Sequence, residues 1–422
     1  MIERKLDVWF RHQRVGTLRD AGAVWSFEYD PDWLRATDGF DLSPALPRAN
    51  GRIEDGGSQR PVQWFFDNLL PEEEARALLA READMAQADA FGLLAWYGAE
   101  SAGALVLLAP GVQPATGGLQ PLPDAELSAR IHHLPQQSLA LGAPKRMSMA
   151  GAQHKLAVVV RDGELYEPVG LAPSTHILKP DHVHVEHYPH SVANEWFCMN
   201  LAARTGLPVP AVAVRRVPEP VYLVERFDRM GAWPDMQRRH MLDACQLLSL
   251  DRTFKYQQST AETLASLVGL TREKALTRQR LFRWAVFNAL TGNGDAHLKN
   301  LSFFVEPTGT RLAPHYDLVS TASYAAPGDW GAAELSLPMG RARRFGDLRR
   351  DDVLAFGEVI GIPAVVGTRL LDELLKHIEA AARALLEQVE ASGGFAAQSG
   401  ELRLLRTIQF GVLRDMQRQL AG

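Results

Sequence analysis

One stretch decides how this chain is interpreted: Thr291-Gly292-Asn293-Gly294-Asp295-Ala296-His297-Leu298-Lys299-Asn300. It follows a run of apolar residues at helical spacing that closes at a glycine, and it precedes two short β-patterned runs over 301–305 and 311–314. An aspartate followed five positions later by an asparagine, on a loop between a helix and a strand, is the spacing of phosphoryl-transfer catalytic loops. In that chemistry a carboxylate accepts the proton of an attacking hydroxyl, and a neutral amide oxygen binds Mg²⁺.

Three residues elsewhere in the chain complete the set of side chains that phosphoryl transfer uses, in the order Lys, Glu, Asp-x4-Asn, Asp. Lys179 ends a predicted strand over 175–179, and Glu195 lies on a predicted helix over 192–205. A strand lysine on nucleotide phosphates, held by a helix carboxylate, is common in phosphoryl transfer. Asp317 follows the second β-run, where it would supply another hard oxygen ligand. Each residue alone is usually structural, so the prediction rests on their order.

No glycine-rich Walker-type loop is present, which excludes a P-loop enzyme. A GxGxxG loop is also absent, and residues 148–155 stand in its place before a predicted hairpin. Small side chains there would let backbone N–H groups approach phosphates.

Composition narrows the class of protein. The chain has 422 residues, of which 46% are hydrophobic and 23% charged, as is ordinary for globular domains. A net charge of −5 excludes a chain that holds nucleic acid by bulk positive charge. Two cysteines, Cys198 and Cys245, exclude a disulfide framework and a Cys-rich zinc site. No apolar stretch approaches the ~20 residues of a membrane span, and the first residues do not resemble a signal peptide. We therefore expect a soluble cytoplasmic protein.

The pattern along the chain predicts an α+β, two-lobed fold. Two β-patterned runs near 6–10 and 23–28 are separated by turn residues, and Pro71 with its following glutamates marks a helix start. A Pro/Gly-rich stretch near 110–125 indicates a boundary. We expect an N-terminal subdomain over 1–110, a linker over 111–145, a β-rich nucleotide-binding lobe over 146–232 and an all-helical lobe over 233–422. Helices over 368–390 and 401–420 belong to the last.

These motifs together resemble the HipA serine/threonine kinases, the toxins of HipBA-type toxin–antitoxin modules. The resemblance extends over nearly the whole chain and implies a protein-kinase-like fold. The segments that carry it are 13–16, 65–71, 147–155, 175–179, 194–195, 224–229, 295–300 and 316–317.

The resemblance implies a role for each matching residue. Asp295 would be the catalytic base, Asn300 and Asp317 would hold Mg²⁺, and Lys179, paired with Glu195, would contact the ATP phosphates. The backbone of 225–227 would hold adenine, and Ser148 matches a serine that family members autophosphorylate. The residues expected to bind ATP are Ala150, Gly151, Ala152, Gln153, His154, Lys155, Lys179, Glu225, Arg226, Phe227, His297, Leu298, Lys299, Asn300, Tyr316 and Asp317. His154 in place of a more usual Glu, and Ala296 in place of Gly, are departures that remove no catalytic atom.

Four alternatives stay open. A histidine run could bind Zn²⁺ or Ni²⁺, although such a run is also an ordinary polar loop; its members are His182, His184, His187 and His190. Residues 294–297 also resemble part of a two-metal phosphoesterase site, but the required Asp/His pairs upstream are missing. A small-molecule kinase of the aminoglycoside or choline type has a similar catalytic loop. A catalytically inactive binding module is the fourth alternative.

Partners follow from the resemblance. It implies a HipB-like antitoxin, operator DNA bound through that complex, and a protein substrate of the aminoacyl-tRNA synthetase class, glutamyl-tRNA synthetase among them. A local basic patch would contact DNA phosphates, or else is a solvated turn; it consists of Arg341, Arg343, Arg344, Arg349 and Arg350.

Overall fold

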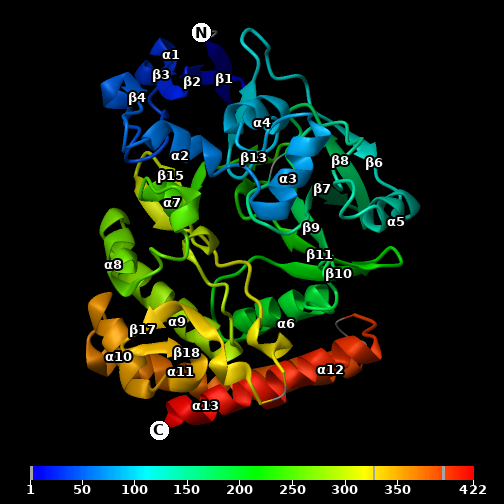
Figure 1. The fold of residues 1–422 in the computed structure, drawn as a ribbon, viewed down its shortest axis with the longest axis vertical. Coiled ribbons are helices and arrows are strands. Elements are labelled where there is room, and N and C mark those ends of the chain that lie inside the picture. Colours follow the sequence, from blue (N-terminus) through cyan, green and yellow to red (C-terminus); the bar gives the residue numbers. More distant parts are fainter. Residues whose placement is uncertain (1–2, 148, 327, 392–394) are drawn as a thin grey trace.

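The N-terminal part is built on an antiparallel sheet with the strand order β4-β3-β2-β1-β5. The computed structural model describes residues 3–147, 149–326, 328–391 and 395–422 (Figure 1). Between the two predicted β-runs lies a further strand, β2, which buries Val15 and Leu18 in the middle of this sheet. The strands are β1 (Arg4–Phe10), β2 (Gln13–Ala21), β3 (Val24–Tyr29), β4 (Arg52–Glu54) and β5 (Leu105–Leu108), and the helices are α1 (Pro31–Arg35), α2 (Pro61–Asp67), α3 (Glu73–Glu82) and α4 (Ala90–Tyr97).

A second sheet has the order β10-β11-β9-β7-β8-β6. Its central hairpin turns at Asp162 and Gly163, both at positive φ, as the Asp-Gly pair predicts. The segment expected as a linker is instead structured: β6 pairs with β8, and helix α5 follows it. The elements are β6 (Gly118–Pro121), α5 (Asp124–His132), β7 (Leu156–Arg161), β8 (Glu164–Val169), β9 (His176–Pro180), β10 (Val212–Arg216) and β11 (Pro220–Glu225).

Helix α6 (Ser191–Arg204) covers one side of this sheet next to β10 and β11. Ten of its side chains are buried, so the helix lies between the sheet and the helices α11 and α12. It is the element that joins the second sheet to the C-terminal part (Figure 1).

The C-terminal part is dominated by helices, but the expectation that it is all-helical is wrong. The β15–β16 hairpin pairs with β14, and β17 pairs with β18. The helices are α7 (Ala244–Leu247), α8 (Ala261–Leu270), α9 (Lys274–Thr291), α10 (Arg350–Val359), α11 (Ala364–Glu390), α12 (Ser399–Thr407) and α13 (Arg414–Ala421), and residues 408–413 form a π-helical segment between the last two. The strands are β12 (Arg229–Met230), β13 (Gln237–Arg238), β14 (Met241–Asp243), β15 (Ser302–Glu306), β16 (Gly309–Leu312), β17 (Glu334–Met339) and β18 (Ala342–Arg344).

The core shows how these parts are joined. One continuous cluster of buried apolar side chains runs from the N-terminal sheet into the C-terminal helices, whereas the β7–β11 region has its own smaller cluster. Among the described residues no helix is both long and apolar enough to span a membrane.

Candidate active site

Lys179 and Glu195 meet in the interior, as their predicted positions on a strand and the next helix require. Lys179 Nζ donates to Glu195 Oε1 at 2.8 Å, and both side chains are 6% exposed. The same ammonium also donates to Asp317 Oδ1. The structure therefore brings together three of the predicted site residues, from β9, α6 and the segment after β16.

Two carboxylates share this one ammonium, and their pKa values move apart. Burial raises the pKa of Glu195 to about 7, although Lys179 acts against this. Burial would also raise the pKa of Asp317, but the charges of Lys179 and Lys155 lower it to about 2. The pKa of Lys179 is raised, because the two carboxylates outweigh the burial that would lower it. Lys179 and Asp317 are thus charged at neutral pH.

Asp317 is held in a left-handed backbone conformation, with φ of +54°. The segment that follows it is fixed to α6 and to the catalytic loop. Asn194 accepts a hydrogen bond from Ser320 N at 2.8 Å and donates one to Ser320 O at 3.0 Å. Thr321 Oγ1 accepts a hydrogen bond from Gly294 N at 2.7 Å. A non-glycine residue at positive φ costs about 1–3 kcal/mol and is retained where the surroundings enforce it.

The catalytic loop leaves α9 at Gly292, which has φ of +68°. Asn293 accepts a hydrogen bond from Asp295 N at 2.9 Å and donates one to Asn288 at 2.8 Å, so α9 fixes the backbone before the aspartate. The Asp295 side chain is 50% exposed, and the Tyr256 hydroxyl donates a hydrogen bond to its carboxylate. Asn300 Nδ2 donates to Asp295 O at 2.8 Å. One hydrogen bond therefore ties together the two ends of the Asp-x4-Asn motif.

The loop over 150–155 places a second, partly buried cation near the first. Lys155 Nζ donates to Ala150 O at 2.6 Å, and Gly151 between them has φ of +107°. Burial and the neighbouring charge of Lys179 together lower the pKa of Lys155 to about 8. Gln153 lies near Pro180 O at 3.5 Å, and burial lowers the pKa of His154. Ser148, the predicted autophosphorylation site, lies outside the described residues.

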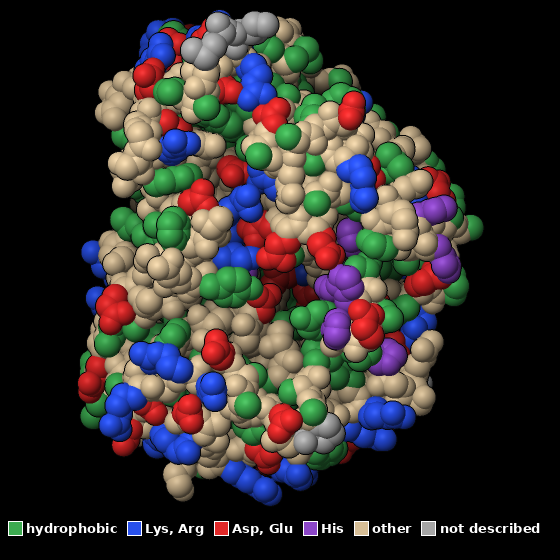
Figure 2. Space-filling view, viewed as in Figure 1, with side chains coloured by type: hydrophobic (Ala, Val, Ile, Leu, Met, Phe, Trp, Pro, Cys, Tyr) green, Lys and Arg blue, Asp and Glu red, His purple; other side chains and the backbone are tan. Residues whose placement is uncertain are grey.

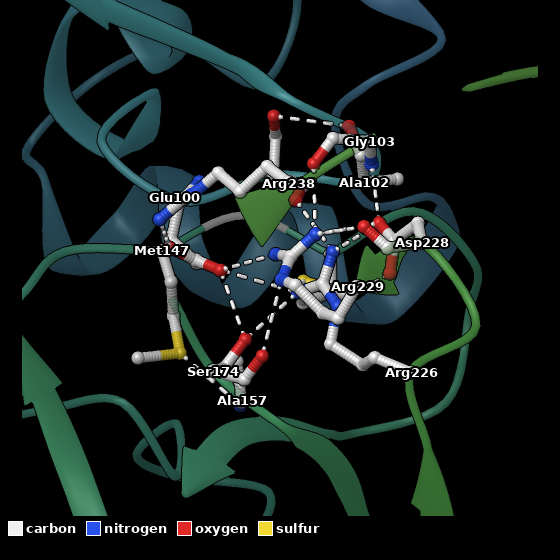
Figure 3. Close-up of polar contacts among 12 residues, drawn as sticks. Glu100, Ala102, Gly103, Met147, Ala157, Ser174, Arg226, Asp228, Arg229 and Arg238 are labelled. Carbon is white, nitrogen blue, oxygen red and sulfur yellow. Dashed lines mark hydrogen bonds and ion pairs between the residues drawn. The ribbon is translucent and has the colours of Figure 1, made fainter. Parts of the chain in front are cut away.

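The backbone of residues 225–227 is predicted to hold adenine. The N–H groups of Glu225 and Arg226 are already bonded, to Ala211 O at 2.9 Å and Thr175 O at 2.8 Å. The Arg226 side chain is buried in a charged cluster and bonds Asp228 and Glu100 (Figure 3). The Arg226 side chain is therefore structural, and the contact of the 225–227 backbone with adenine stays a prediction.

That cluster, the Glu100 cluster, joins the N-terminal part to Lys145 and to the segment after β11. The Glu100 carboxylate is fully buried and forms ion pairs with Lys145, Arg226, Arg229 and Arg238 (Figure 3). Asp228 balances part of the excess positive charge through Arg226 and Arg229.

Three residues predicted to bind ATP have side chains that are engaged within the protein. The Lys299 ammonium donates to Asn68 O at 3.1 Å, to Asn68 Oδ1 at 2.8 Å and to Asp243 Oδ2 at 2.6 Å. The Leu298 side chain is in the apolar core. Tyr316 uses its hydroxyl to bond Lys299 O at 2.7 Å, and its ring lies 5.5 Å from that of Phe227. These contacts fix the position of the three residues, and their contact with ATP stays a prediction.

The histidine run forms a rim, not a metal centre. Within the described ranges, no three His, Cys, Asp or Glu side chains are grouped so that they could hold a metal ion. His184 instead lies 3.1 Å from Glu74 of α3, and His297 packs edge-on against Tyr256. Figure 2 shows Asp, Glu, Lys and Arg side chains gathered in a hollow at the middle of one face, with histidines along one side of it.

Two residues in this region were missed from the sequence. Tyr256, on the loop after α7, contacts Asp295, and Glu72, which precedes α3, contacts both Lys255 and Lys299. Neither lies in a motif of fixed spacing. Only the Phe65–Pro71 segment that ends beside Glu72 pointed toward this region, through the resemblance.

Comparisons with known proteins agree with this arrangement. Residues 6–108 match the HipA N-terminal domain, and residues 147–388 match the HipA-like C-terminal domain. A putative kinase, Y4mE, of Sinorhizobium fredii is 34% identical over 91% of this chain and 93% of its own length. The serine/threonine-protein kinase toxin HipA of Shewanella oneidensis is 32% identical over 71% of each chain. A chain from the solved Shewanella oneidensis complex of HipA, HipB and operator DNA superposes with a TM-score of 0.82 at 27% identity, covering 99% of this chain and 97% of that one. The chain therefore belongs to the HipA family, and it is a kinase.

Proposed function

We propose that this chain is a serine/threonine-protein kinase toxin that transfers the ATP γ-phosphate to a serine of a translation protein and thereby arrests growth. The proposed acceptor class is the aminoacyl-tRNA synthetases, glutamyl-tRNA synthetase for example. The observation that carries the proposal is the buried contact of Lys179 with both Glu195 and Asp317. It supports a phosphate-binding lysine held by a helix carboxylate beside a metal-binding aspartate.

Each side chain would have a separate task in the transfer. Asp295 is half-exposed, so an acceptor hydroxyl can reach it and give up its proton to the carboxylate. Lys179 and Lys155 would neutralise phosphate charge. With the Glu225 and Arg226 N–H groups occupied, adenine would have to use the remaining backbone groups of 225–227.

Asn300 and Asp317 fit Mg²⁺. They offer an amide oxygen and a carboxylate, the hard oxygen ligands that this ion prefers, and Mg²⁺ is usually held by one or two side chains together with phosphates. The Asn300 amide nitrogen is engaged by Asp295 O, which leaves its oxygen as the ligand atom. When bound, the ion neutralises charge on the phosphates.

The proposed partners are a HipB-like antitoxin and, through it, operator DNA. The support is the likeness to the chain solved in the complex of HipA, HipB and operator DNA. In the predicted basic patch Arg341, Arg343, Arg344 and Arg349 are exposed, whereas Arg350 pairs with Asp372 at 2.6 Å. We keep the four exposed arginines as the proposed phosphate contacts.

We also propose that Ser148 is a site of self-inactivation. A phosphate there would add about −1.5 to −2 charge close to the 150–155 loop, which would repel ATP. Mass spectrometry of kinase incubated with ATP, followed by nucleotide binding before and after phosphatase, tests this. Phosphate on Ser148 with unimpaired ATP binding would contradict it.

The acceptor class is tested by radiolabel transfer from γ-labelled ATP. We expect label on a synthetase mixture and none on an aminoglycoside or choline. Label on the small molecule alone would instead support a small-molecule phosphotransferase, and no label on any acceptor or on the kinase would contradict both.

A further inference from the structure

Glu72 touches three segments of the proposed site although it belongs to the N-terminal subdomain. Its backbone N–H donates to Gly151 O, in the 150–155 loop, at 3.2 Å. Its carboxylate lies 2.5 Å from Lys255 Nζ and 3.5 Å from Lys299 Nζ. Lys299 is part of the catalytic loop, and Lys255 directly precedes Tyr256.

These contacts are buried, so solvent cannot replace them. Glu72 is 3% exposed, Lys255 8% and Lys299 7%. Burial raises the pKa of Glu72, but the charges of Lys299 and Lys255 outweigh it and the net pKa is lowered. Asp243 is the second buried carboxylate, and it pairs with Lys299 at 2.6 Å. Two carboxylates thus balance two ammonium groups.

Both cations are connected to Asp295. Tyr256, next to Lys255, donates to the Asp295 carboxylate. Lys255 O and Ser259 also accept from Leu298 N, at 3.4 Å and 3.1 Å, which fixes the 255–259 loop against the catalytic loop. Lys299 precedes the predicted metal ligand Asn300. Loss of the Glu72 charge would leave Lys255 with the exposed Glu73 alone, at 3.5 Å.

We propose that Glu72 is a positioning residue, which sets the catalytic loop through Lys255 and Lys299 and so makes the N-terminal subdomain part of the active site. The inference rests on the proposed function of Asp295 as base. Misplacement of a catalytic group by about 1 Å can reduce a rate by about 10²-fold.

Glu72→Gln in the full chain tests the inference, since it removes the charge and keeps the backbone bond to Gly151. Glu167→Gln is the matched control, because Glu167 is equally buried and pairs with Arg130 at 2.6 Å away from the site. For Glu72→Gln we expect kcat per folded molecule to fall by about 10–100-fold with little change in KM for ATP. We expect Glu167→Gln to keep the wild-type kcat.

Hydrogen exchange of the 293–300 amides gives a readout that does not need activity. We expect faster exchange in Glu72→Gln than in Glu167→Gln. If Glu72→Gln does not fold, Glu72→Asp is tested instead. It keeps the charge on a side chain that is shorter by one methylene, and we expect a smaller loss of kcat than the one predicted for Glu72→Gln. An unchanged kcat, an equal loss in the control, or a loss confined to KM would overturn the inference. A wild-type protein that transfers no phosphate would contradict the proposed function instead, and the exchange comparison would still decide whether Glu72 holds the catalytic loop.

Discussion

At the scale of single residues, the proposed site depends on a few carboxylates with distinct surroundings. Asp295 is half-exposed beside Tyr256, Glu195 is buried against Lys179, and Asp317 lies at a positive φ angle. Asp295 is the most exposed of the three, and Asp317 lies beside Lys179. In the proposed function the same kind of side chain would therefore serve as base, as support for the lysine and as metal ligand.

Asp295→Asn and Asp317→Ala should each reduce phosphate transfer by about 10²–10⁴-fold, the usual effect of removing a base or charge-stabilising group. Asp295 lies outside the apolar core, so Asp295→Asn should keep a thermal unfolding midpoint near that of the wild type, whereas Asp317→Ala removes a partner of the buried Lys179 and should lower the midpoint. Kinase rate and circular dichroism on the same preparations check both statements. Wild-type transfer by either variant would remove that residue from the mechanism.

Lys155 should make ATP binding depend on pH. Its lowered pKa of about 8 means that the ammonium is charged below that pH and neutral above it. Because the charged form attracts phosphate, we expect the Kd for ATP to rise as pH increases through about 8, and Lys155→Met to bind weakly with no such step. Isothermal titration between pH 7 and 9.5 measures this. If the Kd for ATP still rises near pH 8 in Lys155→Met, the pH dependence belongs to another group.

At the scale of elements, the sequence predicts those helices and turns that depend on residues close together in the chain. The Asp162–Gly163 hairpin, helix α6 and the long helix α11 follow from turn chemistry and apolar periodicity. Strand β6 was missed, because it is stabilised by pairing with β8 more than by its own pattern. The C-terminal stretch expected as one helix contains a π-helical segment over 408–413 that apolar spacing does not show.

The end of α9 gives a test at this scale. A Cβ on Gly292 would lie 2.7 Å from Val412 and 2.8 Å from Ala322, at φ of +68°. Gly163 is the matched control, since its φ is +81° and nothing lies within 4 Å of its Cβ position. Positive φ alone costs alanine about 1–2 kcal/mol. We expect Gly292→Ala to lower the free energy of unfolding by more than Gly163→Ala and also to reduce activity. Equal losses in a denaturant titration would mean that the close contacts do not matter.

At the scale of the whole molecule, charged clusters hold the parts together. Glu100 comes from the N-terminal part, and its cationic partners come from the 133–155 connection and from the region after β11. Such a cluster cannot be predicted from sequence, because a buried arginine with carboxylate partners looks the same as one on a ligand. The resemblance assigned Arg226 and Lys299 to ATP, and only the structure shows that their side chains are bonded within the protein, whereas Lys179, Glu195, Asp295, Asn300 and Asp317 were found through their order. Glu72 was missed because its partner Lys255 is 183 positions away.

Glu100→Gln should destabilise the fold by about 3–5 kcal/mol, because it leaves several buried cations short of a counter-charge. Glu390→Gln, which breaks the exposed pair with Arg406, should cost at most about 1 kcal/mol. Denaturant unfolding at pH 7 compares the two. Equal small losses would show that the Glu100 cluster does not join the parts of the chain.

In the proposed function, Asp295 is the base for phosphate transfer to a protein serine. Quantitative phosphoproteomics after brief expression of the wild type or Asp295→Asn tests it most directly. We predict phosphoserine on a protein of translation, an aminoacyl-tRNA synthetase first, in cells with the wild type only, together with growth arrest. Growth arrest without any Asp295-dependent phosphoserine would contradict the account.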